Sequence, residues 1–275
     1  MIFKSGQSAE ALPPCAQDID FNRFGGPAMA LRVGFGDDDT KVPEHRHAQG
    51  QLILALHGAV TCTAVGGLWL VPSGSAVWIP GGVPHSNQAT HNARLIYLFV
   101  EPSESDLPPT CRSVSVSPML REMILRLADV DHAAPDERTS RLMRVLLDEL
   151  ALMPNGGPVL PLTDHPKIAL IAAALAADPA DRRTLGEWAR HVAVSERSLK
   201  RLMVKETGLT FSHWRRQLHL IIAVRELAGG ATVQKVSGDL GYESVTAFIV
   251  MFKKALGVTP SRYRPHADLG SRQTA

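Results

Sequence analysis

The residues of this sequence best suited to bind a metal ion are three histidines and a glutamine in the first third of the chain. His45 and His47 are one residue apart, Gln51 follows four places later, and His85 lies further on. His45, His47 and Gln51 share parity, so an extended strand points all three side chains to one face. Three imidazoles and an amide oxygen suit one divalent transition metal ion, Zn²⁺, Ni²⁺, Cu²⁺ or Fe²⁺.

Three uses of these residues are open from the sequence. They could perform metal-dependent catalysis, hold a metal ion for sensing or structure, or line a ligand pocket and form hydrogen bonds without metal. Gln51 is neutral, whereas the non-haem iron oxygenases bind iron through two histidines and a carboxylate. The sequence therefore favours the two non-catalytic uses, and we predict that the chain is not an enzyme.

The segments that carry these histidines resemble the two sequence motifs of the cupin β-barrels. The first runs from His45 to Gly58, and the second is "GSAVWIPGGVPH" at positions 74–85. The chain departs from the family at Gln51, where cupins normally have glutamate, and at Ala89, where an asparagine is expected. The resemblance implies an antiparallel barrel that encloses roughly one small molecule. Its apolar or stacking walls could be formed by three residues that also suit an ordinary core, Trp69, Trp78 and Tyr97.

The elements that must position these residues are short strands. From about residue 29 to residue 100, apolar stretches such as "QLILALHG" and "ARLIYLFV" alternate with Gly-Gly, Ser-Gly and Pro-Gly turns. Such spacing is typical of an antiparallel β-barrel or sandwich. After the Pro-rich segment 101–110 the apolar period becomes helical. We expect a cupin-like barrel over 1–110 and a helical linker over 111–162, which is also the expected dimerisation region.

One helix of the linker should carry a narrow apolar seam. Its members are spaced three, four and three residues apart and are Met143, Leu146, Leu150 and Met153. So short a seam suits either core packing or a dimeric coil, and core packing is the more common of the two.

The strongest pattern in the sequence lies in its last third. The segment "TLGEWARHVAVSERSLKRLMVKETG" at 184–208 repeats apolar residues at helical spacing on both sides of a short break. Ser195 can cap the second helix, because its hydroxyl accepts a backbone N–H that has no intrahelical partner. The pattern predicts a helix-turn-helix unit over about 184–207. The second helix would present to DNA Arg197, Ser198, Lys200 and Arg201.

A second unit of the same kind is predicted over about 232–256, after a segment at 210–230 whose centre should be helical. In this unit Gly241 makes the turn and Ser244 caps the next helix, which carries Phe248 and Phe252 inward. The fold class is therefore α+β with two domains, the second being all-α over 163–266. A disordered tail is expected over 267–275.

The stretch "DLGYESVTAFIVMFKKALGVTPSRYR" resembles the signature of AraC/XylS-type transcription regulators. Its matching elements are Gly241 and Tyr242, the Phe-rich helix, and the ending from Gly257 through Pro260 to Arg264. The resemblance covers roughly 165–265 and implies two helices in neighbouring major grooves. It implies base or phosphate contacts by the four residues of the first helix named above and by Ser244, Val245 and Thr246. The family often has a basic residue where this chain has Val250, which weakens base reading by the second unit.

The charge is divided in a way that agrees with this interpretation. Residues 1–162 hold 12 basic against 17 acidic residues, while 163–275 hold 17 against 10. Such asymmetry indicates that the C-terminal part meets a polyanion. The three cysteines lack any Cys-x-x-Cys pair, the start lacks a signal peptide, and no apolar run is long enough for a bilayer. We therefore expect a cytoplasmic protein that has no membrane contact.

The sequence thus predicts a DNA-binding transcriptional regulator, and the family resemblance favours an activator. Its expected partners are a double-stranded DNA operator, a small-molecule effector, a second copy of the chain and, for an activator, RNA polymerase. The alternative is a cupin-type dioxygenase or isomerase fused to a DNA-binding domain. The missing carboxylate at Gln51 argues against that alternative.

Overall fold

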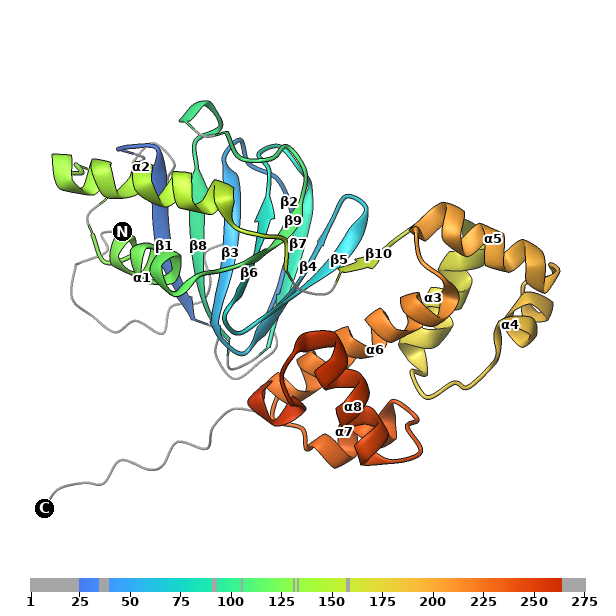
Figure 1. Ribbon diagram of the computed structural model, residues 1–275. Helices are drawn as coiled ribbons and strands as arrows, with labels where there is room; N and C mark the ends of the chain where they lie inside the picture. Colours follow the sequence, from blue (N-terminus) through green and yellow to red (C-terminus); the bar gives the residue numbers. More distant parts are fainter. Residues whose placement is uncertain are drawn as a thin grey trace, which may run out of the picture.

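The computed structural model describes residues 25–34, 40–90, 93–104, 106–130, 132, 134–156 and 159–263. Strands come first along the chain, and an almost wholly helical part follows (Figure 1). Arg264 of the C-terminal motif and the predicted tail at 267–275 lie outside the described residues. The expected order of a β domain followed by helices is confirmed.

The strands form two antiparallel five-stranded sheets. The first sheet has the order β1 (Ala28–Gly34), β8 (Arg94–Val100), β3 (Gly50–His57), β6 (Ser75–Ile79) and β9 (Arg112–Ser115). The second has the order β10 (Val159–Pro161), β5 (Gly67–Pro72), β4 (Ala59–Ala64), β7 (His85–Ala89) and β2 (Thr40–His45). A short 3-10 helix, η3 (Pro102–Glu104), follows β8. The predicted barrel is thus built as two facing sheets.

Side chains of β3 point alternately into two different hydrophobic clusters. Ile53 and Ala55 pack in the cluster between the two sheets, whereas Leu52 and Leu54 belong to a cluster on the outer face of the first sheet. Successive side chains of a strand point to opposite faces. Gln51 has the parity of Ile53 and therefore lies on the inter-sheet face.

Helices α1 (Pro118–Leu127) and α2 (Glu137–Leu152) cover that outer face (Figure 1). Ser117 caps α1 and Asp136 caps α2 through backbone N–H groups of the first turn. Met143, Leu146 and Leu150 of the apolar seam are buried against the sheet. The interpretation of this seam as core packing is confirmed.

The sheets extend beyond residue 110, the expected end of the barrel. Strand β9 pairs with β6 in the first sheet, and β10 pairs with β5 in the second. The segment 111–162 is therefore not only helical, because both of its ends return to the sheets. Strands of three or four residues carry too few side chains to show a period in the sequence.

The last third contains the two predicted helix-turn-helix units. After α3 (Pro166–Ala177), the first unit consists of α4 (Leu185–His191) and α5 (Glu196–Thr207). The long helix α6 (Phe211–Ala228) leads to the second unit, α7 (Val233–Asp239) and α8 (Val245–Leu256), and to the 3-10 helix η4 (Pro260–Tyr263). Gly208 and Gly257 end α5 and α8 in the left-handed conformation that favours glycine.

The helical part is packed directly on the second sheet. Ala59, Leu70 and Leu160 from that sheet belong to the same buried cluster as the helices α3 to α8. The indole Nε1 of Trp214 on α6 donates to the carbonyl oxygen of Pro161 on β10 at 3.0 Å. The short strand β10 therefore joins the sheets to the longest helix of the C-terminal part.

Candidate functional site

The first recognition helix, α5, has one buried face and one basic exposed face. Ser195 accepts the backbone N–H of Ser198 at 3.1 Å and so starts the helix. Leu199 and Met203 are fully buried. Around the rest of the helix the exposed residues include Arg197, Ser198, Lys200, Arg201 and Lys205. The structure brings all the predicted contacts of this helix onto its accessible surface.

The second recognition helix, α8, repeats this construction with fewer charges. Ser244 accepts the backbone N–H of Ala247 at 3.1 Å, and Phe248 and Phe252 are buried. Thr246 is exposed as predicted, whereas Val245 is half-buried. When the two capping serines are aligned, Ala247 and Lys254 are equivalent to Ser198 and Lys205. Neither Ala247 nor Lys254 was among the DNA contacts expected from the sequence. Aligning the two capping serines in the sequence points to both positions.

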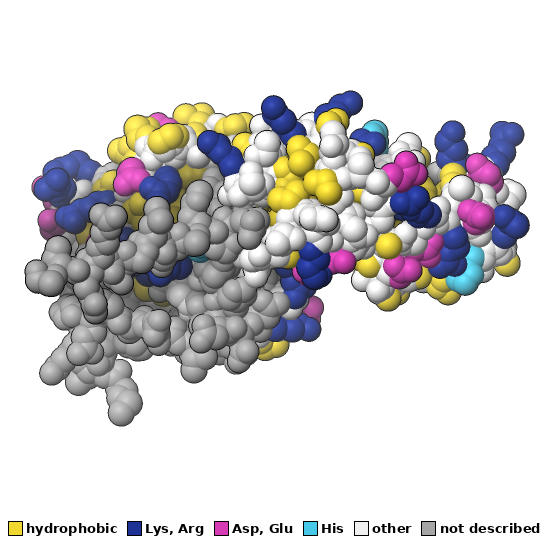
Figure 2. All heavy atoms as spheres, turned by 90° about the horizontal axis from the view of Figure 1, so that it is seen from below, with side chains coloured by type: hydrophobic (Ala, Val, Ile, Leu, Met, Phe, Trp, Pro, Cys, Tyr) yellow, Lys and Arg dark blue, Asp and Glu magenta, His cyan; other side chains and the backbone are white. Residues whose placement is uncertain are grey.

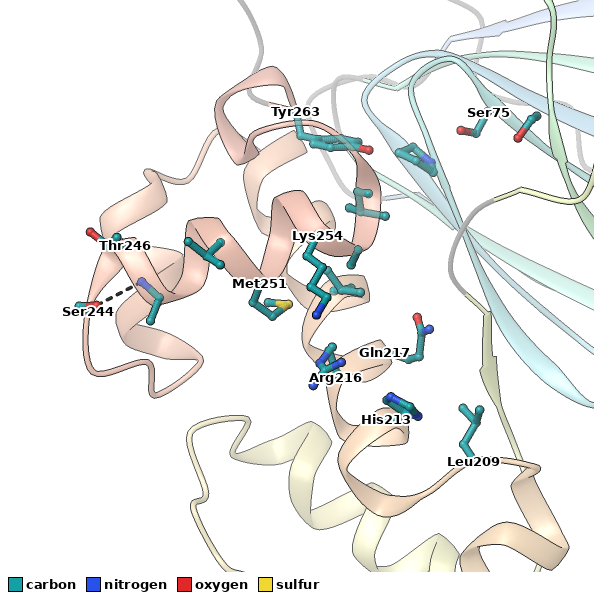
Figure 3. A pocket seen from close by; sticks show the side chains of 17 residues that line it. Ser75, Leu209, His213, Arg216, Gln217, Ser244, Thr246, Met251, Lys254 and Tyr263 are labelled. Atoms are coloured by element: carbon teal, nitrogen blue, oxygen red, sulfur yellow. Dashed lines mark hydrogen bonds between the residues drawn. The ribbon is translucent and has the colours of Figure 1, made fainter.

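The outward face of α8 borders a groove of about 1090 Å³ between α6, α8 and the edge of the β domain. In Figure 3, Lys254 and Met251 of α8 point toward Arg216 on α6. The groove wall also includes Thr246 and Val250. Positive charge therefore stands beside Val250 on both α6 and α8, although Val250 itself carries none.

A second, smaller hollow of about 500 Å³ lies between the start of α6 and the turn of the second unit. Its lining includes four arginines, Arg182, Arg183, Arg215 and Arg216. The Arg183 guanidinium beside Asp181 holds the pKa of that carboxyl below its usual range.

On the side of the molecule seen in Figure 2, Lys and Arg side chains lie over the helical part with Asp and Glu among them.

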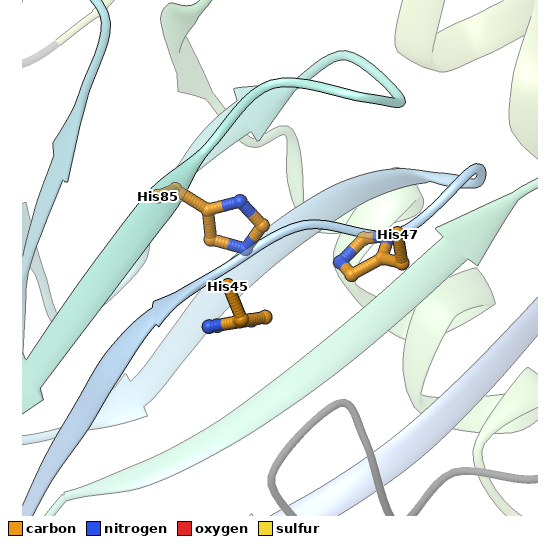
Figure 4. Close-up of side chains that lie close together, drawn as sticks. All are labelled: His45, His47 and His85. Atoms are coloured by element: carbon orange, nitrogen blue, oxygen red, sulfur yellow. The ribbon is translucent and has the colours of Figure 1, made fainter.

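Within the β domain, the structure brings the three predicted histidines together (Figure 4). His45 ends β2, His85 begins β7, and the two residues are register partners. His47 follows in the next loop. One ligand nitrogen from each ring lies within 4.8 Å of the others. Oε1 of Gln51 on β3 lies 2.9 Å from Nε2 of His85 and 3.3 Å from Nε2 of His47.

Burial keeps two of these rings neutral at physiological pH. Desolvation is the largest cause and lowers the pKa of His85 to about 4, with further lowering by the nearby His45 and His47. Desolvation also lowers the pKa of His47. In a neutral imidazole one ring nitrogen carries no hydrogen and can accept a hydrogen bond. This neutral form is also the one that binds metal ions.

The structure separates the three aromatic residues expected to line an effector pocket. Trp69 and Tyr97 both pack in the cluster between the two sheets. Trp78 lies on the opposite face of the first sheet, in the cluster beneath α1 and α2, and its Nε1 donates to the carbonyl oxygen of Pro108 at 2.9 Å. Trp78 is therefore part of the packing under the helices, because its parity on β6 is that of Ala76.

Two buried polar atoms between the sheets were not singled out from the sequence. Asn87 shares the parity of His85 and Ala89 on β7, and Ser113 is the register partner of Val77. The Asn87 Oδ1 and Ser113 Oγ atoms are buried and have no hydrogen-bond partner among the described residues. Such groups usually bind water or a ligand. The sequence pointed only to Asn87, because a polar residue two positions after His85 lies on the same face of the strand.

Comparisons with known proteins agree with both halves of this arrangement. Residues 31–164 match the AraC-like ligand binding domain family, and residues 188–266 match a helix-turn-helix domain family. The chain belongs to the AraC-type helix-turn-helix transcriptional regulators. It is 51% identical over 251 residues to the HTH-type transcriptional regulator NimR of Escherichia coli, covering 90% of this chain and 91% of that protein.

More distant similarities were also found. The HTH-type transcriptional regulator RipA of Corynebacterium glutamicum is 29% identical over 145 residues, which cover 50% of this chain and 44% of RipA. The solved structure of ToxT from Vibrio cholerae aligns with 86% of this chain and 96% of its own, at 10% identity and a TM-score of 0.37. The relatives are named as transcriptional regulators, in agreement with a DNA-binding protein that is not an enzyme. Among the described residues, no helix is long and apolar enough to cross a membrane.

Proposed function

We propose that this regulator reads a double-stranded DNA operator with both recognition helices and that α5 supplies most of the base discrimination. The observation that carries this proposal is the exposure of Arg197, Lys200 and Arg201 on one helix. Arginine and lysine bind guanine edges, and each good bidentate contact contributes about 1–3 kcal/mol of discrimination. On α8 the contacts would come from Ser244, Val245 and Thr246, with Val245 and Thr246 contacting thymine methyl groups.

The length of α6 supports simultaneous contact with two major grooves. Its 18 residues span about 27 Å at ~1.5 Å per residue. Successive major-groove faces recur every ~34–36 Å, and the offset of each unit from α6 supplies the remainder. Selection of bound sequences from a random DNA pool, followed by footprinting at fixed salt, tests the proposal. We expect two protected major-groove segments on one face of the duplex; protection of a single segment would contradict it.

We propose that a small-molecule effector binds between the two sheets. Trp69 and Tyr97 would provide apolar contact, and the Asn87 amide and Ser113 hydroxyl would supply hydrogen bonds. This lining suits a mainly apolar molecule with one or two polar groups. A thermal-shift screen identifies candidates, and an effector must also change operator affinity, because a ligand shifts an equilibrium only by its difference in affinity for the two states. Asn87→Val should weaken such a ligand at least tenfold.

We further propose that the regulator works as a homodimer joined through α1 and α2. Val145 and Leu152 of α2 lie seven residues apart and so share one helix face, and they are 49% and 76% exposed. Light scattering tests this proposal: the chain should have the mass of a dimer, and Val145→Glu with Leu152→Glu should yield monomers. A dimeric variant would place the interface elsewhere.

The family resemblance supports activation through RNA polymerase, and a DNA operator implies action in the cytoplasm. Transcription in vitro from a template carrying the selected operator checks the direction of control. We expect more transcript when the regulator and its effector are present. Less transcript would mean repression.

A further inference from the structure

The hollow of about 500 Å³ between the start of α6 and the turn of the second unit is strongly basic. Four of its lining residues are the arginines Arg182, Arg183, Arg215 and Arg216, and none of the described lining residues is acidic. Positive charges gathered at short range repel one another, and a bound anion relieves that repulsion. The partners of each arginine show which of the four are available to an anion.

Two of the four arginines are engaged within the protein. The Arg183 Nε atom donates to Asp181 Oδ2 at 2.8 Å. Arg182 donates to the carbonyl oxygen of Gly241 at 2.6 Å and to a carboxylate oxygen of Glu243 at 3.4 Å. The contacts of Arg182 join the segment before α4 to the turn of the second unit, so they hold two walls of the hollow together.

Arg215 and Arg216 are the two arginines that remain. They are neighbours on α6, and neither has an ion-pair partner among the described residues. Their guanidinium groups make one hydrogen bond within that part of the chain, from Arg215 Nη1 to the carbonyl oxygen of Arg183 at 3.4 Å. Burial raises the pKa of Tyr242 in the lining, whereas the charges of Arg216 and Arg215 act in the opposite direction. Both charges therefore reach the hollow, and neither is paired with a carboxylate.

The hollow lies between the two helix-turn-helix units. Its lining includes Thr184 and Leu185 at the start of the first unit and residues 240–242 in the turn of the second. Arg216 also lines the groove along the outward face of α8, where Lys254 points toward it (Figure 3). When two units read neighbouring major grooves on one side of a duplex, the sugar-phosphate backbones of the intervening minor groove pass between them. Arg216 therefore stands between the reading face of α8 and the place where those backbones would pass.

We propose that Arg215 and Arg216 bind phosphates of the operator backbone between the two major-groove segments and so hold α5 and α8 in register with the duplex. This proposal rests on the proposed reading of two grooves. Guanidinium groups form charge-assisted, often bidentate hydrogen bonds with phosphate oxygens. Such contacts position a protein on DNA without reading its bases. The two arginines thus contribute to affinity for every DNA sequence alike, unlike the base contacts of α5.

The salt dependence of DNA binding tests this proposal. Each phosphate contact contributes about 0.9 to the slope of log affinity against log salt concentration, because binding releases condensed counterions. Arg216→Ala should lower the magnitude of that slope by about 0.9, and Arg215→Ala with Arg216→Ala by about 1.8. The ratio of operator affinity to random-DNA affinity should stay unchanged in both variants, whereas Arg201→Ala should lower it. A wild-type slope in Arg216→Ala would overturn the proposal.

Two further variants separate the contact from effects on structure and on net charge. Arg216→Lys keeps the positive charge and should keep the wild-type slope. Arg225→Ala is the matched control, because Arg225 lies nine residues from Arg216, or about two and a half turns, and so faces the opposite side of α6. It should leave the slope unchanged. An equal loss of slope in Arg225→Ala would mean that net charge sets the slope, which would overturn the proposal. Far-UV circular dichroism checks that each variant is folded.

Neutral phosphate analogues locate the contact on the DNA. In the selected operator, single methylphosphonate groups replace the phosphates between the two protected segments, one position at a time. At a contacted position the wild type should lose affinity, whereas Arg215→Ala with Arg216→Ala should lose none, because the partners of that phosphate are already absent. Equal losses for both proteins at every position, with both footprints intact, would overturn this proposal alone. A single protected segment would instead contradict the proposed function.

A free phosphate offers the same chemistry as a backbone phosphate. Thermal unfolding in increasing inorganic phosphate, at constant ionic strength, tests this second source. We expect no saturable stabilisation that depends on Arg216. Saturable stabilisation that Arg216→Ala abolishes, together with an unchanged salt slope, would assign the hollow to a small phosphorylated ligand and overturn the operator contact.

Discussion

Arg201 of α5 and Val250 of α8 occupy the same position on two helices that are built alike. Each follows a capping serine by six residues and the first fully buried residue, Leu199 or Phe248, by two. Both side chains are exposed, and Val250 is 61% accessible. The two recognition surfaces therefore share a geometry but differ in chemistry at this position.

The first prediction concerns operator binding. Arg201→Ala should weaken binding about 5- to 150-fold, the equivalent of the roughly 1–3 kcal/mol that one good bidentate base contact contributes. Val250→Ala should change affinity less than twofold, because a valine offers only apolar contact with a thymine methyl group. Gel-shift titration of the selected operator at fixed salt gives both values. Equal losses in the two variants would show that both helices contribute alike.

The second prediction tests the turn between α7 and α8. Gly241 has φ +72°, and a Cβ added there would lie 3.0 Å from the carbonyl oxygen of Ala180. Gly241→Ala should therefore lower the free energy of unfolding by about 1–3 kcal/mol. Gly238→Ala is the matched control within α7, where an added Cβ meets nothing within 4 Å. It should raise stability by up to ~1 kcal/mol, because alanine favours the helix.

Urea unfolding followed by circular dichroism measures both glycine variants. If Gly241→Ala proved as stable as the wild type, the left-handed turn would not be needed for this unit.

The third prediction concerns pH and the buried His219. Desolvation is the largest cause and lowers the pKa of His219 to about 4, and the nearby Arg215 lowers it further. In the unfolded chain the pKa returns to its ordinary value near 6.5. Between these two values the unfolded state binds a proton that the folded state does not, so stability rises with pH in this window and falls on acidification.

His219→Gln should therefore flatten the dependence of unfolding free energy on pH between about 4 and 6.5. One proton corresponds to at most about 1.4 kcal/mol per pH unit. His85 should respond in the same window, so a slope should remain in the variant. Unfolding curves at several pH values provide the measurement, and identical slopes in the variant and the wild type would contradict the buried neutral form of His219.

The fourth prediction tests the connection between the sheets and α6. Trp214→Phe removes the donor to the Pro161 carbonyl and should cost about 1–3 kcal/mol, because the carbonyl loses its partner. Trp188→Phe is the comparison, since Trp188 is also fully buried and its Nε1 has no hydrogen-bond partner among the described residues. Denaturant unfolding should give the larger loss for Trp214→Phe. The reverse order would mean that ring packing outweighs this hydrogen bond.

The helix-turn-helix units were predictable because their determinants are local. Ser195 and Ser244 stand next to the backbone N–H groups that they accept, and the buried Leu199 and Phe248 recur at helical spacing. Gly241 adopts a backbone conformation that favours glycine, so its identity alone indicated a turn. The parity of His45, His47 and Gln51 predicted one extended strand, which is wrong: His45 ends β2, His47 lies in the following loop, and Gln51 lies on β3 of the facing sheet.

The amino-acid sequence alone determined the fold class and the two DNA-binding units, since caps, turns and side-chain periods act over a few residues. The pairing of β2 with β7 was needed to bring His85 to His45. Only the tertiary structure decided that Trp78 lies beneath α1 and α2, that β9 and β10 return to the sheets, and that Asn87 and Ser113 are left buried without partners among the described residues. These features depend on which strands pair and which faces other elements cover. Such choices join residues far apart in the chain, and no local spacing encodes them.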